Sequence, residues 1–278
     1  MIPALKRPIE EDLSHLARFL RTSGVVHRVT EEGAEQVVWA VDEADAQVIQ
    51  ALYRDGVPEA VGPAPARVRG ATAWQRTLQH IPMTLAVLAI SALVAVLSRL
   101  GSDASVLVHL TFTPVTPEGR LAAYPDLAQW WRLITPIFIH FGMLHLAFNA
   151  LWYWELGRRI EIRSGSLFLL GVTILFALIS NASQWLFGAP GLFGGLSGVL
   201  YGLLGYCWLY QWLCPNVHFD LPRGVVVLML VWLVLCLSGL VTMLGFGAIA
   251  NAAHVGGLVI GGLAGLIAGG LQRQRQSD

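Results

Sequence analysis

The stretch Phe193-Gly194-Gly195-Leu196-Ser197-Gly198 decides the fold, because it joins a glycine-rich break to a hydrophobic run that continues to Leu213. Glycines and Pro190 interrupt any helix before this point, so we expect Ser197 to lie at a helix start. As a helix the run spans roughly 25 Å, less than a bilayer core of roughly 30 Å, and its start therefore lies below the membrane surface. Irregular backbone at that depth must be buried in protein or line a water-filled cavity. A hydroxyl, a helix N-terminus and a cavity are thus predicted to coincide.

The composition places the chain among polytopic membrane proteins. Of its 278 residues, 55% are hydrophobic and only 13% are charged. Residues 1–60 carry 11 acidic and 6 basic residues, a net charge of −5, and the remainder carries 7 acidic and 12 basic residues, a net charge of +5. This asymmetry predicts a soluble domain followed by a membrane body with basic flanks. No basic patch indicates nucleic-acid binding. The N-terminus lacks the pattern of a signal peptide, so we expect the first domain to stay in the cytoplasm.

Residues 1–60 are predicted to form a small α+β domain. Apolar residues at helical spacing indicate helices at Asp12–Arg21 and Glu43–Tyr53. Two β-prone runs, Val25–Thr30 and Glu35–Val41, suggest a hairpin, so the predicted order is α-β-β-α. The remaining divisions are a linker at 61–79, a membrane domain at 80–271 and a cytoplasmic tail at 272–278.

Six hydrophobic segments predict an all-α bundle of six transmembrane helices. They are Ile81–Leu97, Met143–Leu156, Leu167–Phe187, Ser197–Leu213, Val225–Met243 and Ala252–Leu271. Arginines gather before the first segment and after the second, fourth and sixth, which by the positive-inside rule makes those ends, and both termini, cytoplasmic. The connection Gly101–Arg132 ends in an aromatic, amphipathic stretch that we expect to lie in the outer interface.

Polar side chains inside membrane spans are costly and therefore suggest function. Ser197 lies between glycines at a helix N-terminus, where unpaired amides favour a developing oxyanion, although such a serine is also common at helix contacts. His254 precedes a Gly257-x-x-x-Gly261 face, and Gly198 and Gly202 form a similar face on the serine helix. Close approach of the two faces would let the imidazole reach the hydroxyl as a general base. A histidine hydrogen-bonded across helices without chemistry is the alternative.

A second group of polar residues lies in the second hydrophobic segment. His145 and Asn149 are four residues apart, so both can point donors at one spot, as an oxyanion hole requires. His140 is a possible supporting partner or an interfacial histidine, and Tyr201, one turn beyond Ser197, either packs on the imidazole or belongs to the core. Zinc is disfavoured because there is no His-Glu-x-x-His motif and the cysteines are scattered. No acidic residue is placed to orient His254, so a Ser-His dyad is predicted.

Taken together, His145-x-x-x-Asn149, Gly195-Leu196-Ser197-Gly198 and Ala253-His254-x-x-Gly257-x-x-x-Gly261 closely resemble the rhomboid family of intramembrane serine proteases. Trp131-Arg132 matches the Trp-Arg pair of that family, and a soluble domain before six spans is similar to a bacterial subgroup. The resemblance covers residues 80–271. It implies that Ser197 is the nucleophile and His254 the base, and that His145, Asn149 and the Ser197 amide stabilise the oxyanion. It also implies a lateral gate at Phe148 and Trp232, a capping loop at Leu244–Asn251, and residues that hold water at Ser180 and Gln184.

The expected function is cleavage of transmembrane segments of other membrane proteins near the outer face of a bacterial inner membrane. The chemistry needs no cofactor or metal, and the partners are the substrates and the lipid bilayer. A substrate helix must unwind locally before its backbone can enter the site, so we expect small or helix-breaking residues near the cut. Two other classes remain: a non-catalytic protein that binds client spans in the same cavity, and a small-molecule transporter, which a discontinuous span also suggests.

Overall fold

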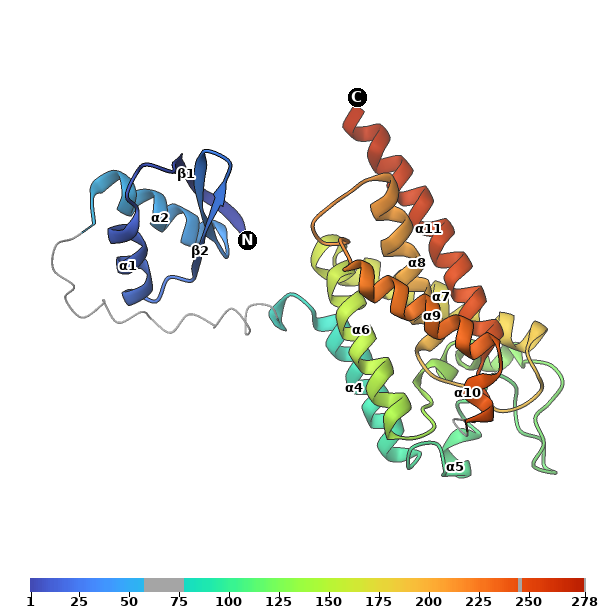
Figure 1. Ribbon diagram of the computed structural model, residues 1–278. Helices are drawn as coiled ribbons and strands as arrows, with labels where there is room; N and C mark the ends of the chain where they lie inside the picture. Colours follow the sequence, from blue (N-terminus) through green and yellow to red (C-terminus); the bar gives the residue numbers. More distant parts are fainter. Residues whose placement is uncertain (58–77, 245–246, 278) are drawn as a thin grey trace. The chain divides into compact units, whose positions relative to one another are not determined.

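The computed structural model describes residues 1–57, 78–244 and 247–277, in two compact units, Met1–Thr72 and Ala73–Asp278. The chain is mostly helical, with one small sheet near the N-terminus, which confirms the predicted class at that level (Figure 1). The predicted linker at 61–79 lies almost entirely outside the described residues.

The N-terminal unit is a three-stranded antiparallel sheet with two helices. Its elements are β1 (Ile2–Pro8), α1 (Ser14–Thr22), β2 (His27–Glu32), β3 (Glu35–Ala40) and α2 (Glu43–Asp55), and the strand order is β1-β3-β2. Leu20, Val38 and Ile49 are fully buried in its core. The predicted α-β-β-α order was wrong in lacking β1. That strand contains Pro3, ends at Pro8 and has a register shift, which an edge strand tolerates but which hides the alternating pattern.

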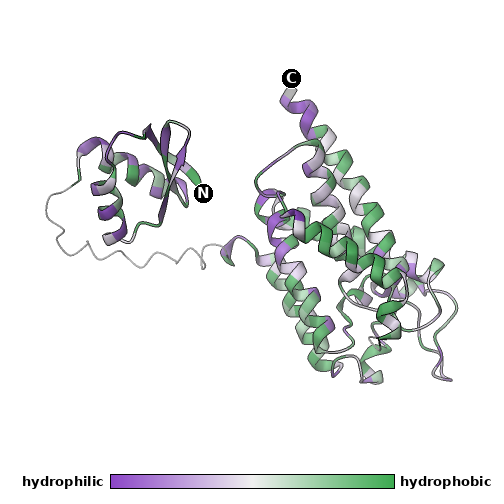
Figure 2. Cartoon of the chain, in the orientation of Figure 1, coloured by the Kyte–Doolittle hydropathy of each residue, from purple (hydrophilic) through white to green (hydrophobic). Residues whose placement is uncertain are grey.

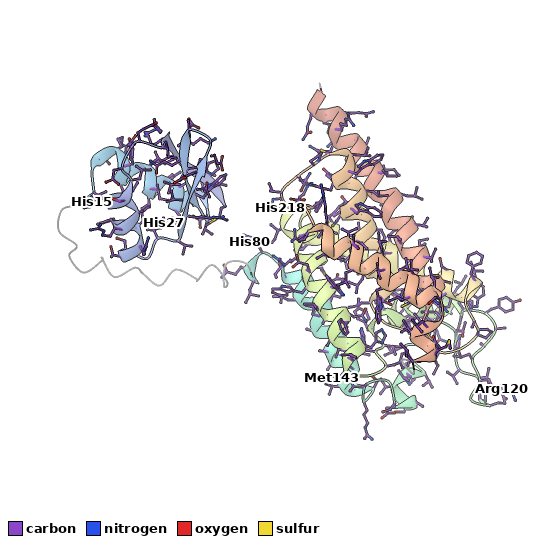
Figure 3. All side chains as sticks on the ribbon, viewed as in Figure 1. His15, His27, His80, Arg120, Met143 and His218 are labelled. Carbon is purple, nitrogen blue, oxygen red and sulfur yellow. The ribbon has the colours of Figure 1, made fainter. Side chains whose placement is uncertain are left out.

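The second unit is a helical body. It contains α4 (Pro82–Leu97), α5 (Ala104–Leu107), the 3₁₀ turns η1 (Leu127–Leu133) and η2 (Thr135–Phe138), α6 (Met143–Ser164), α7 (Ser166–Phe187), α8 (Ser197–Leu213), α9 (Arg223–Leu237), α10 (Leu240–Met243) and α11 (Asn251–Ser277). These helices are predominantly hydrophobic along their lengths (Figure 2). Arg120 and Met143 lie at one end of this body and His218 at the other (Figure 3).

Helix α8 is the centre of this unit. Eleven of its residues are buried, from Gly198 to Tyr210. It packs most extensively against α11, which runs beside it, and also against α7 and α6 (Figure 1). A helix that is apolar on all sides is stable only when neighbours cover it, and the surrounding helices therefore fix the direction and depth at which Ser197 begins.

Among the described residues, two helices, Ser166–Phe187 and Asn251–Gln276, are long and apolar enough to cross a membrane, judged by length and composition. A third span is possible if Leu127–Phe138 and Met143–Ser164, which meet at a 95° bend, are counted as one. Helices α4 and α9, with 16 and 15 residues, are shorter than the roughly 20 residues that a perpendicular span requires. The arrangement with six spans therefore stays a prediction.

The predicted segment Val225–Met243 was wrong as one continuous element. Helix α9 ends at Leu237, and the chain turns at Gly239, whose φ of 78° is left-handed, before the short α10 begins. Glycine adopts that conformation without steric cost, so α9 can end at Ser238-Gly239 within a run that is otherwise predominantly hydrophobic.

The connection between α4 and α6 is held by one buried arginine. The Arg132 guanidinium donates to the carbonyl oxygens of Val108 (2.8 Å) and Thr111 (3.1 Å), and its Nε donates to Gln129 Oε1 (2.7 Å). Trp130 remains 64% exposed on the same turn. At the aromatic end of this connection, Arg132 is thus buried and hydrogen-bonded while Trp130 is exposed, which is compatible with an element that lies at a membrane interface.

Candidate active site

Ser197 and His254 meet where two helices begin. Ser197 is the first residue of α8, and His254 lies one turn into α11, which starts at Asn251. The Ser197 Oγ and His254 Nε2 atoms are 2.8 Å apart, within hydrogen-bond range, and the histidine is only 5% exposed. With its proton on Nδ1, the imidazole accepts the hydroxyl hydrogen at Nε2, which is the arrangement that a general base needs.

The other imidazole nitrogen has no orienting acid. His254 Nδ1 is buried and has no hydrogen-bond partner among the described residues. Within the described residues, Ser197 and His254 therefore form a pair, and the predicted dyad stays a prediction.

Glycines make this meeting possible. A Cβ at Gly257 would overlap the carbonyl oxygen of Gly198, and a Cβ at Gly261 would overlap that of Gly202. Helices α8 and α11 thus touch backbone to backbone, which larger residues would prevent. This close approach places the His254 side chain within reach of Ser197.

Tyr201 packs against His254 from one turn beyond Ser197 on α8. Its ring centroid lies 4.9 Å from that of His254, with an angle of 46° between the planes. Its hydroxyl donates to the main-chain carbonyl of Met229 on α9 at 3.0 Å. Tyr201 therefore packs on the imidazole and also belongs to the buried hydrophobic core, so the structure contains both arrangements considered for it.

His145 lies beside Gly195, a residue of the loop that leads into α8. A Cβ at Gly195, whose φ is +114°, would come within 2.7 Å of His145 Nε2, so the imidazole occupies the space that a side chain would take. Its Nδ1 faces the amide of Phe141 at 3.4 Å. Nε2 therefore points toward the start of α8, where the unpaired amides of the helix N-terminus also lie.

Asn149 lies one turn after His145 on α6 and bonds back to it. It is 3% exposed, and its Nδ2 donates to the His145 carbonyl at 2.7 Å, while Oδ1 is buried without a partner among the described residues. An amide nitrogen carries two hydrogens, so this hydrogen bond uses only one of them; the oxyanion role of Asn149 stays a prediction.

His140 contacts the site through His145. The two ring centroids are 5.2 Å apart, and His140 Nδ1 lies 3.1 Å from the Phe138 carbonyl. It is fully buried, and its Nε2 has no hydrogen-bond partner among the described residues; its role as a supporting partner or as an interfacial histidine stays a prediction.

The expected water-holding residues lie next to the dyad. A Cβ at Gly198 would come within 2.6 Å of the Ser180 side chain, and Gln184 Oε1 accepts the amide of Ala253 at 3.2 Å. The expected gate residues Phe148 on α6 and Trp232 on α9 are 55% and 46% exposed, as side chains at the edge of a helical body are.

Comparison with known proteins identifies the class. The family model "Rhomboid domain" matches residues 127–270, which is half of the chain, and "Rhomboid N-terminal domain" matches residues 1–61. The chain therefore belongs to the rhomboid family and is an intramembrane serine endopeptidase. This excludes the transporter and favours the enzyme over the client-binding alternative.

Three curated relatives of this chain are each named Rhomboid protease GlpG. The chain is 34% identical to the Rhomboid protease GlpG of Serratia proteamaculans over 261 residues, covering 87% of this chain and 88% of that protein. It is 34% identical over 257 residues to the Rhomboid protease GlpG of Klebsiella pneumoniae, with the same coverage. The Yersinia pestis protein of that name is 39% identical over 180 residues, which are 65% of this chain and 60% of that protein.

Proposed function

We propose that Ser197 and His254 are the catalytic dyad of this protease. The observation that carries the proposal is the 2.8 Å approach of Ser197 Oγ to His254 Nε2 at the adjoining starts of α8 and α11. A serine that only packs between helices does not require a buried imidazole at this distance, with a stacked tyrosine behind it.

The proposed chemistry is acyl transfer. His254 accepts the Ser197 proton as Oγ attacks the scissile carbonyl, and the resulting oxyanion is stabilised by His145, Asn149 and the Ser197 amide. His254 then donates the proton to the leaving amine. A water molecule, activated by the same imidazole, hydrolyses the acyl-enzyme and restores the serine.

The substrates are transmembrane segments of other membrane proteins. The proposed route of entry lies between α6 and α9, at Phe148 and Trp232. A substrate helix satisfies its own backbone hydrogen bonds, so it must unwind locally before a carbonyl can reach Ser197. Small or helix-breaking residues near the cut reduce that cost.

The proposed topology has six spans in a bacterial inner membrane, with both termini in the cytoplasm. Arg158, Arg159 and Arg163 gather at one end of α6 and favour that end as cytoplasmic. Ser197 then lies toward the opposite, outer side. We retain the domain divisions at 1–60, 61–79, 80–271 and 272–278 as part of this proposal.

Cleavage in proteoliposomes tests the proposal. A reporter with one transmembrane segment should be cut by the wild type and not by Ser197→Ala or His254→Ala. A second reporter with prolines around the cut should be cut faster, because its helix is already weakened. Undiminished cleavage by either variant would exclude the dyad, and equal rates for both reporters would exclude the unwinding step.

A further inference from the structure

Helix α9 is the least enclosed long helix around the site. Of its 15 residues, only Met229, Leu233 and Cys236 are buried. Val227 and Val234 are more than half exposed. Apolar packing against the protein therefore holds α9 along one narrow stripe, and the polar contacts that it makes gain importance for its position.

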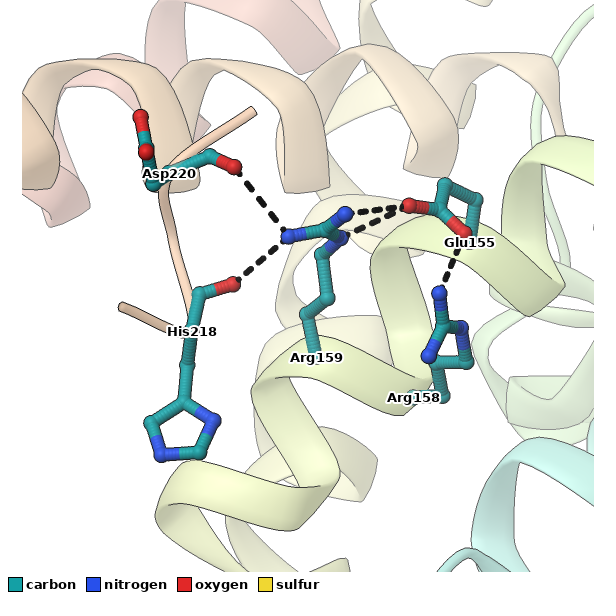
Figure 4. A network of polar contacts seen from close by, with 5 residues as sticks. All are labelled: Glu155, Arg158, Arg159, His218 and Asp220. Carbon is teal, nitrogen blue, oxygen red and sulfur yellow. Dashed lines mark hydrogen bonds and ion pairs between the residues drawn. The ribbon is translucent and has the colours of Figure 1, made fainter. Parts of the chain in front are cut away.

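One polar contact holds the cytoplasmic end of α9. Arg159 on α6 donates through Nη1 to the carbonyl oxygens of His218 (3.1 Å) and Asp220 (3.3 Å), which belong to the loop that leads into α9 (Figure 4). Its Nε and Nη2 atoms bind Glu155 at 2.8 and 2.6 Å, and this pairing fixes the guanidinium in place. Arg158 binds the same carboxylate at 2.7 Å. Among the residues in Figure 4, Glu155 is its one partner, whereas Arg159 also reaches the loop.

A second polar contact holds the middle of α9. The Tyr201 hydroxyl donates to the Met229 carbonyl at 3.0 Å, and both residues are at most 5% exposed. A third contact joins Asn251 Nδ2 to the Cys236 carbonyl at 3.0 Å. Of these side chains, Tyr201 is the one whose ring also lies on the His254 imidazole.

We propose that Tyr201 is a positioning residue that makes the alignment of His254 depend on the docked position of α9. A buried hydroxyl without an acceptor is costly, so the phenol follows the Met229 carbonyl when α9 moves. The ring then shifts on the imidazole, and the Ser197–His254 hydrogen bond loses its alignment. Arg159 contributes from a distance, because its contact with the loop fixes the end of α9. The base is thus aligned only while α9 is closed against α8.

This inference rests on the proposed dyad, and inactivation by a fluorophosphonate serine probe tests the two separately. The maximal inactivation rate constant reports the alignment of the dyad, and the half-saturating probe concentration reports probe binding. Tyr201→Phe keeps the ring and loses the hydroxyl, and should lower the rate constant about fivefold, the equivalent of one neutral hydrogen bond. The half-saturating concentration should stay unchanged.

Replacing Arg159, which does not contact Ser197 or His254, tests whether the position of α9 is coupled to the alignment of His254. Arg159→Met should also lower the rate constant, and the double variant Arg159→Met/Tyr201→Phe should be no slower than Tyr201→Phe alone, because the connection is already lost. Arg158→Met is the matched control: it removes an arginine from the same carboxylate without releasing the loop, and should react like the wild type.

Three results would overturn the inference: an unchanged rate constant in Tyr201→Phe, multiplied effects in the double variant, or equal effects of Arg158→Met and Arg159→Met. Hydrogen exchange across residues 224–237 supplies a check that does not depend on Tyr201→Phe folding. Faster exchange in Arg159→Met with an unaltered inactivation rate would also reject the coupling. If His254→Ala were inactivated as fast as the wild type, the dyad itself would be wrong. That result is distinct from the ones that reject the coupling.

Discussion

Replacing Gly261 by alanine should separate the two catalytic helices. The added Cβ would overlap the Gly202 carbonyl oxygen, a main-chain atom that cannot rotate away. Ordinary contact begins at 3.4 Å, so α8 and α11 must move apart by roughly 1.5 Å. Overpacking of this kind costs about 1–3 kcal/mol.

The same displacement should affect the chemistry as well as the stability. Gly261 lies two turns after His254, so moving α11 lengthens the 2.8 Å contact between His254 Nε2 and Ser197 Oγ. A misplacement of about 1 Å lowers a rate by about 100-fold. Probe inactivation and thermal unfolding in detergent should be measured together. Gly270→Ala is the control on the same helix, because its Cβ would meet open space. The reasoning is refuted if Gly261→Ala and Gly270→Ala react with the probe at the same rate.

Three further substitutions test other parts of the structure. Asn149→Asp removes the amide donors at nearly constant size and should lower kcat on the reporter about 100-fold with little change in KM; retained kcat would exclude the residue from the oxyanion hole. Glu161 accepts four hydrogen bonds, from Met83, Thr84 and Ser166, at 2.7 Å each. Glu161→Ala should therefore lower the free energy of unfolding, measured by denaturation in mixed micelles, by about 3 kcal/mol. A smaller loss of stability in Glu161→Ala than in Glu155→Ala would contradict this prediction. Arg132→Lys loses the planar fork and should cost about 2 kcal/mol in the same assay; unaltered stability would show that the connection before α6 does not depend on it.

The candidate site could be found in the sequence because each of its parts has a local signal. Glycine spacing marked the contact between α8 and α11, and the break before Ser197 marked a helix start inside a hydrophobic region. Those two patterns also predicted that His254 would come near the hydroxyl. Their roles in catalysis remain predictions for the experiments described here.

Other features had no signal in the sequence. The acceptor for Tyr201 is the main-chain carbonyl of Met229, and a carbonyl leaves no trace in residue identity. Arg159 likewise donates to main-chain carbonyls, those of His218 and Asp220 in the loop before α9. Strand β1 was missed because its prolines conceal a pairing that only the neighbouring β3 makes possible. Hydropathy alone could not reveal the break at Gly239, since a single serine and a glycine scarcely lower the hydropathy of a long apolar run.

The most direct test of the account is fluorophosphonate labelling of the wild type, Ser197→Ala and His254→Ala in detergent. The 2.8 Å hydrogen bond predicts an activated hydroxyl. The wild type should therefore be labelled at Ser197, and either substitution should abolish labelling while thermal unfolding shows that the variants remain folded. Labelling that persists in His254→Ala, or its absence in a folded wild type, would contradict the dyad.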